Sequence, residues 1–239
     1  MQARLHLVFR QPGIVTKEAR LSEGHEPLLP EEAAIVCMSV EKRRQEFTAS
    51  RSCARRALAE IGIVNFPLLA DQHRAPIWPT SVVGSITHTD GCPKGYCGVA
   101  VADRRVAMGI GLDAEPRQPL PLDVWPLVLD EREQRDARQT SSPGIRARLI
   151  FSAKETTYKT LFPAFRRFLE FSDVHIDFAP EQGVFFSELV GSAREFGLAE
   201  KRLVGRFVID DELLVTGMIL PATGLGLAQE GLSLHHDTC

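Results

Sequence analysis

The sequence predicts an α+β protein made of two similar halves, each with helices packed on an antiparallel sheet. Amphipathic helical stretches alternate along the chain with short apolar strands joined by tight turns. Two segments of the first half recur in the same order in the second half. With 239 residues, 44% of them hydrophobic, the chain can bury a core of ordinary size. Two such halves would pack about a pseudo-twofold axis, and the interface between them is a common place for a ligand.

The first half is expected to hold one helical region followed by strands. Residues 1–29 contain scattered prolines and glycines and are expected to be irregular apart from one strand. The helical region begins at Pro30-Glu31-Glu32, where a proline and two acids suit a first turn, and ends at Gly62. Alternating polar positions and a tight turn then predict strands over 82–88, 96–102 and 106–112.

The second half is expected to have helices first and strands after them. Helices are predicted over 120–138 and 145–162, the second one stopped by Pro163. The strands are predicted over 174–178, 184–187, 204–209 and 213–220, with the last hairpin turn at Asp210-Asp211 or Asp211-Glu212. The tail from residue 221 has no periodic core signal and is expected to be flexible.

The internal repeat aligns residues 47–52 (FTASRS) with residues 151–156 (FSAKET). The turn and strand at 103–112 match those at 211–220 at a similar offset. Two matches in the same order at nearly equal offsets indicate a duplicated module. In this alignment Arg51 takes the position of Glu155, so one copy carries a cation where the other carries a carboxylate.

Composition excludes several classes of function. A net charge of −3 argues against nucleic acid or a membrane as a partner of the whole surface. Five cysteines at irregular spacing do not form a disulfide framework, so a reducing, cytoplasmic compartment is expected. Residues 1–13 include Arg4 and Arg10 and no long apolar run, which predicts neither a signal peptide nor a membrane span.

Two carboxylates follow the strand at 106–112 and suggest a metal site. Strand side chains alternate between faces, so Gly109, Gly111, Asp113 and Glu115 share one face of this strand. Neighbouring like charges on one face repel, and a cation between them would relieve the repulsion. Oxygen ligands favour Mg²⁺ or Mn²⁺, which usually also bind phosphates. The alternative is a solvated acidic loop.

The helix at 145–162 carries the second set of candidates. Glu155 and Lys159 lie one turn apart on one face, and Lys154 precedes Glu155. Alone, they would be read as a surface ion pair. If this helix packs beside the Asp113 strand, Glu155 adds a third oxygen ligand and the lysines offset phosphate charge. With a strand-end histidine and the arginine-rich helix before Gly62, this combination is typical of a Mg²⁺ and polyphosphate site.

Three motifs in order resemble one enzyme family. They are Gly84-Ser85-Ile86-Thr87-His88, the segment 109–116 (GIGLDAEP), and the segment 151–159 (FSAKETTYK) followed by Phe162-Pro163. Together they resemble the 4′-phosphopantetheinyl transferases, in particular the monomeric two-lobed class that includes siderophore-pathway and actinobacterial enzymes. The likeness runs from about Pro30 to about Leu220. The two similar α+β lobes of that class agree with the repeat.

The resemblance implies a reaction and its residues. The phosphopantetheine arm of coenzyme A would pass to a serine of an apo acyl or peptidyl carrier protein, releasing adenosine 3′,5′-bisphosphate. Asp113, Glu115 and Glu155 would hold Mg²⁺, with Mn²⁺ as a substitute. Glu155, directly or through a metal-bound water, would be the base, and Lys159 would assist it at the phosphates. The coenzyme A contacts carried over are Arg43, Arg51, Arg74, Ser85, His88, Lys154 and Lys159. Ala70 replaces a further lysine of some actinobacterial relatives.

The implied organisation has two lobes and a tail. Residues 1–112 would form the lobe for the coenzyme A nucleotide, 113–220 the lobe for the metal and the catalytic helix, and 221–239 the flexible tail. The resemblance also implies a cytoplasmic monomer that serves fatty acid, polyketide, nonribosomal peptide or siderophore assembly. The sequence does not choose among these pathways.

Two other functions compete with this interpretation. The same acids could serve a Mg²⁺-dependent phosphoesterase or nuclease, although the net charge disfavours nucleic acid. Alternatively, the arginine helix could dock an acidic partner without catalysis. A further hypothesis is that Arg166 and Arg167, just past the site, meet an acidic carrier helix. Two apparent metal clusters are rejected. His88, Cys92 and Cys97 do not follow a zinc-finger spacing, and His235, His236 and Cys239 lie in the tail that is expected to be flexible.

Overall fold

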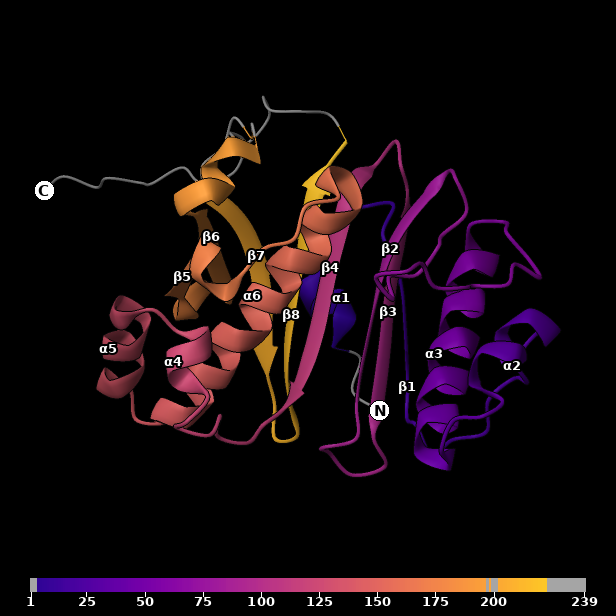
Figure 1. Cartoon of the computed structure of the whole chain (residues 1–239), viewed down its shortest axis with the longest axis horizontal. Coiled ribbons are helices and arrows are strands. Elements are labelled where there is room, and N and C mark those ends of the chain that lie inside the picture. Colours follow the sequence, from indigo (N-terminus) through magenta and orange to yellow (C-terminus); the bar gives the residue numbers. More distant parts are fainter. Residues whose placement is uncertain (1–3, 197, 199–201, 223–239) are drawn as a thin grey trace, which may run out of the picture.

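Two modules lie side by side in the computed structural model, which describes residues 4–196, 198 and 202–222. The first module has a sheet in the strand order β1-β3-β2, and the second has the order β4-β8-β7-β6-β5. All pairs within both sheets are antiparallel. The α+β architecture with two lobes is therefore confirmed (Figure 1).

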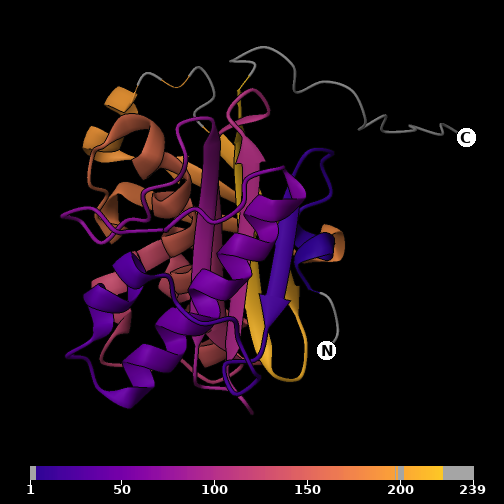
Figure 2. The same ribbon diagram turned by 90° about the vertical axis from the view of Figure 1, so that its right-hand side faces the viewer.

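The elements of the first module agree with the predicted order. Its helices and strands are α1 (Leu5–Val8), β1 (Val15–Ala19), α2 (Pro30–Val36), α3 (Glu41–Glu60), β2 (Val82–Thr89) and β3 (Tyr96–Asp103). The one helical region expected up to Gly62 is two helices, because the chain turns at Cys37–Val40. This turn lets α2 fold back on α3, so that buried Glu32 meets Arg55 at 2.6 Å. Figure 2 looks onto the outer side of this module, where α3 covers the sheet.

The second module begins with a strand. Its elements are β4 (Ala107–Pro116), α4 (Trp125–Val128), α5 (Glu131–Gln139), α6 (Pro143–Phe165), β5 (Val174–Ala179), β6 (Val184–Leu189), β7 (Arg202–Ile209) and β8 (Leu213–Pro221), with 3₁₀ turns at Phe171–Asp173, Pro180–Gln182 and Gly191–Phe196. The expected boundary after residue 112 falls inside β4, all of which pairs with β8. The expected tail beyond residue 222 lies outside the described residues.

Two predicted helix limits in the second module were wrong. The helix predicted over 120–138 is interrupted at Asp130, whose side chain accepts the N–H of Glu133 at 2.8 Å and starts α5 as a new helix. The helix α6 passes through Pro163 and ends at Phe165. A proline removes a single helical hydrogen bond, and this close to the helix end the loss affects only the last turn.

The strand part of the sequence repeat paired strands that are not equivalent. In each sheet the first strand of the module pairs with the second strand of a later hairpin, so β1 corresponds to β4 and β3 corresponds to β8. The match between 103–112 and 211–220 instead set β4 against β8, which are neighbours in one sheet. The helix match holds, because α3 and α6 are the long helices of the two modules.

Three apolar clusters hold the fold together. One joins α3 to the first sheet through residues such as Leu58 and Val99, and another joins α6 to the second sheet through Ile150 and Phe185. The third lies between the modules and contains Ile110, Leu112 and Leu213 with α1 residues. The modules therefore pack against each other through this third cluster, beside the seam where the candidate residues meet. No helix in the described part of the chain is both long and apolar enough to cross a bilayer.

Candidate active site

The helix α6 lies along the strand β4 in a regular register (Figure 1). Arg148 contacts Glu115, and Ser152 contacts Asp113. The backbone carbonyls of Thr156 and Thr160 lie over Gly111 and Gly109. Four helical residues rise about 6 Å, and two strand residues span about 6.6 Å, so every helical turn meets the next same-face strand position. This register brings the two predicted motifs together.

The two glycines of β4 make this close approach possible. A Cβ atom built on Gly111 would lie 2.0 Å from the carbonyl oxygen of Thr156, and one on Gly109 would lie 2.0 Å from that of Thr160. Any side chain at either position would push the helix away from the strand. The face predicted to hold Gly109, Gly111, Asp113 and Glu115 is therefore the face that receives α6.

Asp113 is buried at the centre of the site. Its Oδ1 accepts from the Lys159 ammonium at 2.7 Å, and its Oδ2 accepts from the Ser152 hydroxyl at 2.8 Å. The Ser152 oxygen also lies 2.8 Å from the hydroxyl of Thr216 on β8. Two residues of α6 thus bond the aspartate directly, and one residue of β8 supports it through Ser152.

Glu115, two residues further along β4, is held by a different cation. Its Oε2 accepts from Arg148 Nη1 at 2.6 Å. Burial and the charge of Asp113 raise the pKa of Glu115 to about 7, although Arg148 and Lys159 favour its charged form. The acidic pair is therefore only partly neutralised by the protein, which is the condition that favours a divalent cation.

Glu155 belongs to the same electrostatic group. Burial raises its pKa, opposed by Lys159 and reinforced by Asp113. Burial lowers the pKa of Lys159, but the charges of Asp113, Glu155 and Glu115 outweigh it and raise that pKa overall. One lysine thus interacts with all three predicted carboxylates. These carboxylates come from two elements that are far apart in the sequence.

The three carboxylates do not form a closed ligand shell by themselves. In the described part of the chain, one group of three side chains offers ligand atoms, one from each residue, that all lie within 4.8 Å of one another: Asp130, Glu133 and His175. That group already contains a cation, because Lys154 lies 2.8 Å from Glu133. The donor set of Asp113, Glu115 and Glu155 suits a hydrated Mg²⁺, which keeps several waters and takes only some protein oxygens.

A cationic surface adjoins the acidic group. The His88 side chain at the end of β2 lies 4.0 Å from Glu46 on α3. Burial lowers the pKa of His88; Glu46 opposes this, while Arg43, Lys159 and Arg51 add to it. The charges of Arg43 and Arg51 in the first module and of Lys159 in the second therefore all act on one histidine. These four predicted residues thus belong to one electrostatic group across the seam.

Arg51 is firmly held within this surface. Its guanidinium lies 4.0 Å from the centre of the Phe47 ring, and its Nε donates to the carbonyl of Leu68 at 2.7 Å. Burial lowers its pKa to about 10, with Glu32 opposing the shift. The guanidinium of Arg51 is partly desolvated and uses its Nε for the carbonyl of Leu68. Such a group is suited to bind an anion.

Lys154 lies on another side of α6 and does not reach the site. It is 2% exposed, forms an ion pair with Glu133 at 2.8 Å and donates to the carbonyls of Val128 and Phe171. Consecutive helical residues are rotated by about 100°, so Lys154 and Glu155 meet different neighbours. The phosphate contact expected of Lys154 does not agree with this arrangement.

Ser85 is a seam residue in this structure. Its hydroxyl oxygen accepts the N–H of Leu112 at 3.1 Å, and that of Thr87 accepts the N–H of Ala114 at 3.0 Å. These bonds join β2 to β4 along the line where the two sheets meet. The coenzyme A contact expected of Ser85 would compete with this bond, because the residue is 5% exposed.

Arg74 lies in an exposed turn of the first module that rests on the end of α6. Asp71 in this turn contacts Arg166 at 3.1 Å, and the ring of His73 meets that of Phe162 edge-on. The turn therefore places Arg74 beside the seam, on a backbone with φ of 63°. Arg166 is already paired, and Arg167 lies over the Phe196 ring at 4.8 Å.

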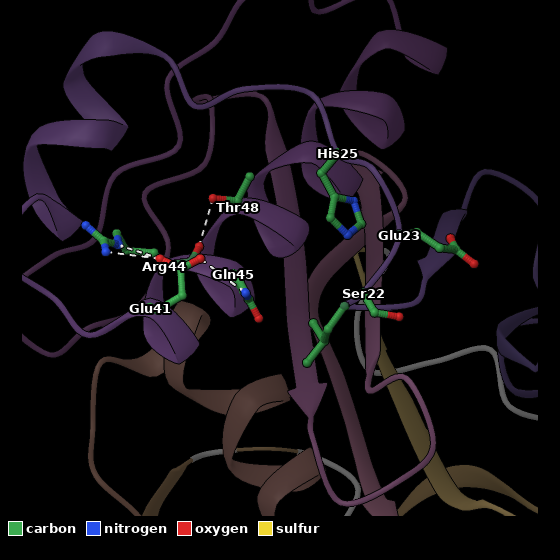
Figure 3. Close-up of a pocket in the computed structure, with 8 residues that line it drawn as sticks. Ser22, Glu23, His25, Glu41, Arg44, Gln45 and Thr48 are labelled. Carbon is green, nitrogen blue, oxygen red and sulfur yellow. Dashed lines mark hydrogen bonds and ion pairs between the residues drawn. The ribbon is translucent and has the colours of Figure 1, made fainter.

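A shallow pocket on another face of α3 is separate from the site. It is lined by Leu21, Ser22, Glu23, His25, Glu41, Arg44, Gln45 and Thr48 (Figure 3). Three of its polar side chains bond to one another, since Glu41 accepts from both Arg44 and Gln45. None of the predicted ligand residues lines this pocket.

Comparison with known proteins gives the family. Residues 31–102 match the 4′-phosphopantetheinyl transferase N-terminal domain, and residues 109–207 match the 4′-phosphopantetheinyl transferase superfamily. The chain is 37% identical over 198 residues to the 4′-phosphopantetheinyl transferase PptT of Mycobacterium tuberculosis, covering 80% of this chain and 86% of that one. The chain belongs to the 4′-phosphopantetheinyl transferase family.

Two further relatives of this transferase agree. It is 37% identical to the 4′-phosphopantetheinyl transferase Svp of Streptomyces mobaraensis, covering 90% of this chain and 89% of that one. It is 39% identical to the 4′-phosphopantetheinyl transferase Npt of Nocardia iowensis, covering 79% and 87%. The predicted actinobacterial type is confirmed, and the protein transfers phosphopantetheine to carrier proteins. The phosphoesterase, nuclease and non-enzymatic alternatives are set aside.

Sequence reasoning missed three residues that contact or support the acidic group of the candidate site. Arg148 and Ser152 precede Glu155 by seven and three positions on α6, and Thr216 lies on β8. Helical spacing signals Arg148, because residues seven apart share one face. Ser152 and Thr216 have no signal of their own, since their role depends on which strand covers them.

Proposed function

We propose that the seam of this transferase holds coenzyme A with its nucleotide on the first module and its pyrophosphate at the acidic group. The single observation that carries this is the position of Lys159, whose ammonium donates to Asp113 Oδ1 at 2.7 Å and whose charge also acts on Glu115, Glu155 and His88. Anionic and cationic groups thus meet where a pyrophosphate and a divalent cation would need them.

Each end of coenzyme A has its own residues. Arg43, Arg51 and His88 would bind the 3′-phosphate of the nucleotide, and Arg74 would border it from the exposed turn. Arg51 is the strongest of these candidates, because its position is fixed by Phe47 and by the carbonyl of Leu68. We place the lobe boundary at the turn before β4, so that the whole strand belongs to the catalytic lobe.

The catalytic lobe would act on the pyrophosphate. Asp113, Glu115 and Glu155 would hold Mg²⁺, which supplies charge neutralisation at the phosphates. Lys159 would add its positive charge to the same oxygens. Glu155 would accept the proton of the carrier serine as its oxygen attacks the β-phosphorus and the bond to the leaving adenosine 3′,5′-bisphosphate breaks.

A direct assay tests the proposal. The enzyme is incubated with coenzyme A, Mg²⁺ and an apo carrier protein, and the intact mass of the carrier is measured. We expect the mass of one phosphopantetheine to be added, no addition after chelation of the metal, and recovery with Mg²⁺ or Mn²⁺. Full transfer in chelator would contradict the metal assignment. Apo carriers from fatty acid, polyketide, nonribosomal peptide and siderophore assembly would identify the pathway.

We also propose that the enzyme acts as a monomer in the cytoplasm. Cys37, Cys53, Cys92 and Cys97 are free thiols, which agrees with a reducing compartment. Both halves of the proposed site come from one chain, so a second copy is not needed to complete it. Light scattering and fractionation would test the two statements.

A further inference from the structure

Arg148 makes three hydrogen bonds around the end of β4. Its Nη1 donates to Glu115 Oε2 at 2.6 Å, its Nε donates to the carbonyl of Gln118 at 2.7 Å, and its Nη2 donates to the carbonyl of Pro119 at 3.1 Å. The side chain is 15% exposed. A guanidinium bonded on three sides has one orientation, so the carboxylate bonded to it is also held in place.

The position of Arg148 relates it to the proposed metal ligands. It lies two helical turns before Glu155, on the side of α6 that faces β4. Its bond occupies Oε2 of Glu115, which leaves Oε1 for an ion. Arg148 also brings a positive charge next to two acids that repel each other: it pairs with Glu115, while Lys159 pairs with the neighbouring Asp113.

We propose that Arg148 is a positioning residue that orients the Glu115 carboxylate for the divalent cation. This inference rests on the proposed function, in which Glu115 is a metal ligand. Residues that hold a ligand carboxylate in place commonly change metal affinity by 10- to 100-fold when they are replaced. A residue with a purely structural role would change stability and leave metal affinity unaltered.

The experiment compares the full-length wild type with Arg148→Met and Arg146→Met. Arg146 is a matched control, because it lies on the same helix, is 17% exposed and contacts Asp136 and the Phe178 ring instead of the acidic group. Binding of Mn²⁺ is measured by electron paramagnetic resonance with coenzyme A present and no carrier. Unfolding by urea, monitored by circular dichroism, gives the stability of each variant.

We expect Arg148→Met to weaken Mn²⁺ binding by about tenfold or more. Arg146→Met should leave Mn²⁺ affinity unchanged, even where it lowers stability. The transfer rate of Arg148→Met should recover in part as Mg²⁺ is raised, because the loss is in metal affinity. Unchanged Mn²⁺ affinity would overturn the proposal. Tighter binding would also overturn it, since Arg148 would then be a cation that competes with the metal.

Two more variants separate this inference from the proposed function. Arg148→Lys keeps the charge and loses the three-sided bonding, so it should also weaken Mn²⁺ binding, and wild-type affinity would overturn the proposal. Glu115→Gln should weaken Mn²⁺ binding by itself, and Arg148→Met should add little to it. If Glu115→Gln leaves affinity unchanged, the metal assignment fails. If only Arg148→Met leaves it unchanged, the positioning role alone fails.

Discussion

The two modules share a buried framework and differ in the charge that their long helices bring to the seam. In each module a glutamate of the short helix accepts three bonds: from its own helix start, from a backbone N–H beyond the long helix, and from a cation on the long helix. Glu32 accepts from Leu29, Leu68 and Arg55. Glu133 accepts from Asp130, Ile176 and Lys154.

The difference lies at the aligned positions Arg51 and Glu155. The charge of Arg51 acts on His88 on the side proposed for the nucleotide, and the charge of Asp113 acts on Glu155 on the side proposed for the metal. The comparison teaches that Lys154 belongs to the buried framework that both modules have, whereas its neighbour Glu155 lies outside that framework and is the residue proposed for the chemistry. A duplicated scaffold can thus supply a cation on one side of a seam and a carboxylate on the other.

The largest expected effect is on catalysis and tests this division of roles. Glu155→Gln should lower the transfer rate by roughly 10²- to 10⁴-fold, because the proposed proton acceptor is lost, while coenzyme A binding stays measurable. Arg51→Gln should instead raise the KM for coenzyme A on the order of tenfold. Steady-state kinetics measures the transfer rate and the KM of each variant, and calorimetry measures its binding of coenzyme A. A normal rate in Glu155→Gln would exclude it as the base.

The next effect separates the two lysines of α6. Lys154→Met leaves the buried carboxylate of Glu133 without its cation and should lower the free energy of unfolding by about 3 to 5 kcal/mol. Its KM for coenzyme A should not change. Lys159→Met should lower the transfer rate with a smaller loss of stability, since Lys159 is more exposed. Urea unfolding and steady-state kinetics compare the variants. If Lys154→Met had a raised KM for coenzyme A and an unchanged free energy of unfolding, Lys154 would be a phosphate ligand after all.

A third effect is the pH dependence of stability without metal. The pKa of Glu115 is about 7 in the folded state and near 4.5 when unfolded, so the folded state holds its proton to higher pH. Stability should therefore fall as pH rises from about 4.5 to 7, by up to about 3 kcal/mol. Arg51 titrates near pH 10 and does not contribute in this window.

Unfolding by urea at several pH values in chelator measures this dependence. Glu115→Gln is the control, because its side chain cannot ionise and the slope should become shallower. Added Mg²⁺ should also reduce the slope, since the cation favours the charged carboxylates. An identical slope in wild type and Glu115→Gln would assign the dependence to other groups, such as Glu155.

The smallest effect concerns the seam. Ser85→Ala leaves the buried N–H of Leu112 without its acceptor and should cost about 1 to 2 kcal/mol of stability. The KM for coenzyme A should stay as in the wild type, because the Ser85 hydroxyl is used between the sheets. A raised KM with unaltered stability would instead support the ligand contact that its motif suggested.

Much of the fold could be predicted from local patterns. The strands at 82–89, 96–103 and 107–116 follow from alternation and turns, and the long helices follow from periodicity. The break at Asp130 was missed although its capping box with Glu133 is visible in the sequence. The break at Cys37–Val40 has no local signal and depends on the contact of Glu32 with Arg55.

The sequence by itself determined the chemistry of the site: three carboxylates, one lysine on the same helical face as Glu155, and an arginine-rich helix. Only the tertiary structure decided which of these groups meet. The side of a helix or strand on which a residue lies follows from local geometry, but the element that covers this side is chosen by packing between distant segments. For this reason the sequence alone could not show that Lys154 pairs with Glu133, that Ser85 joins the two sheets, or that Arg148 bonds Glu115.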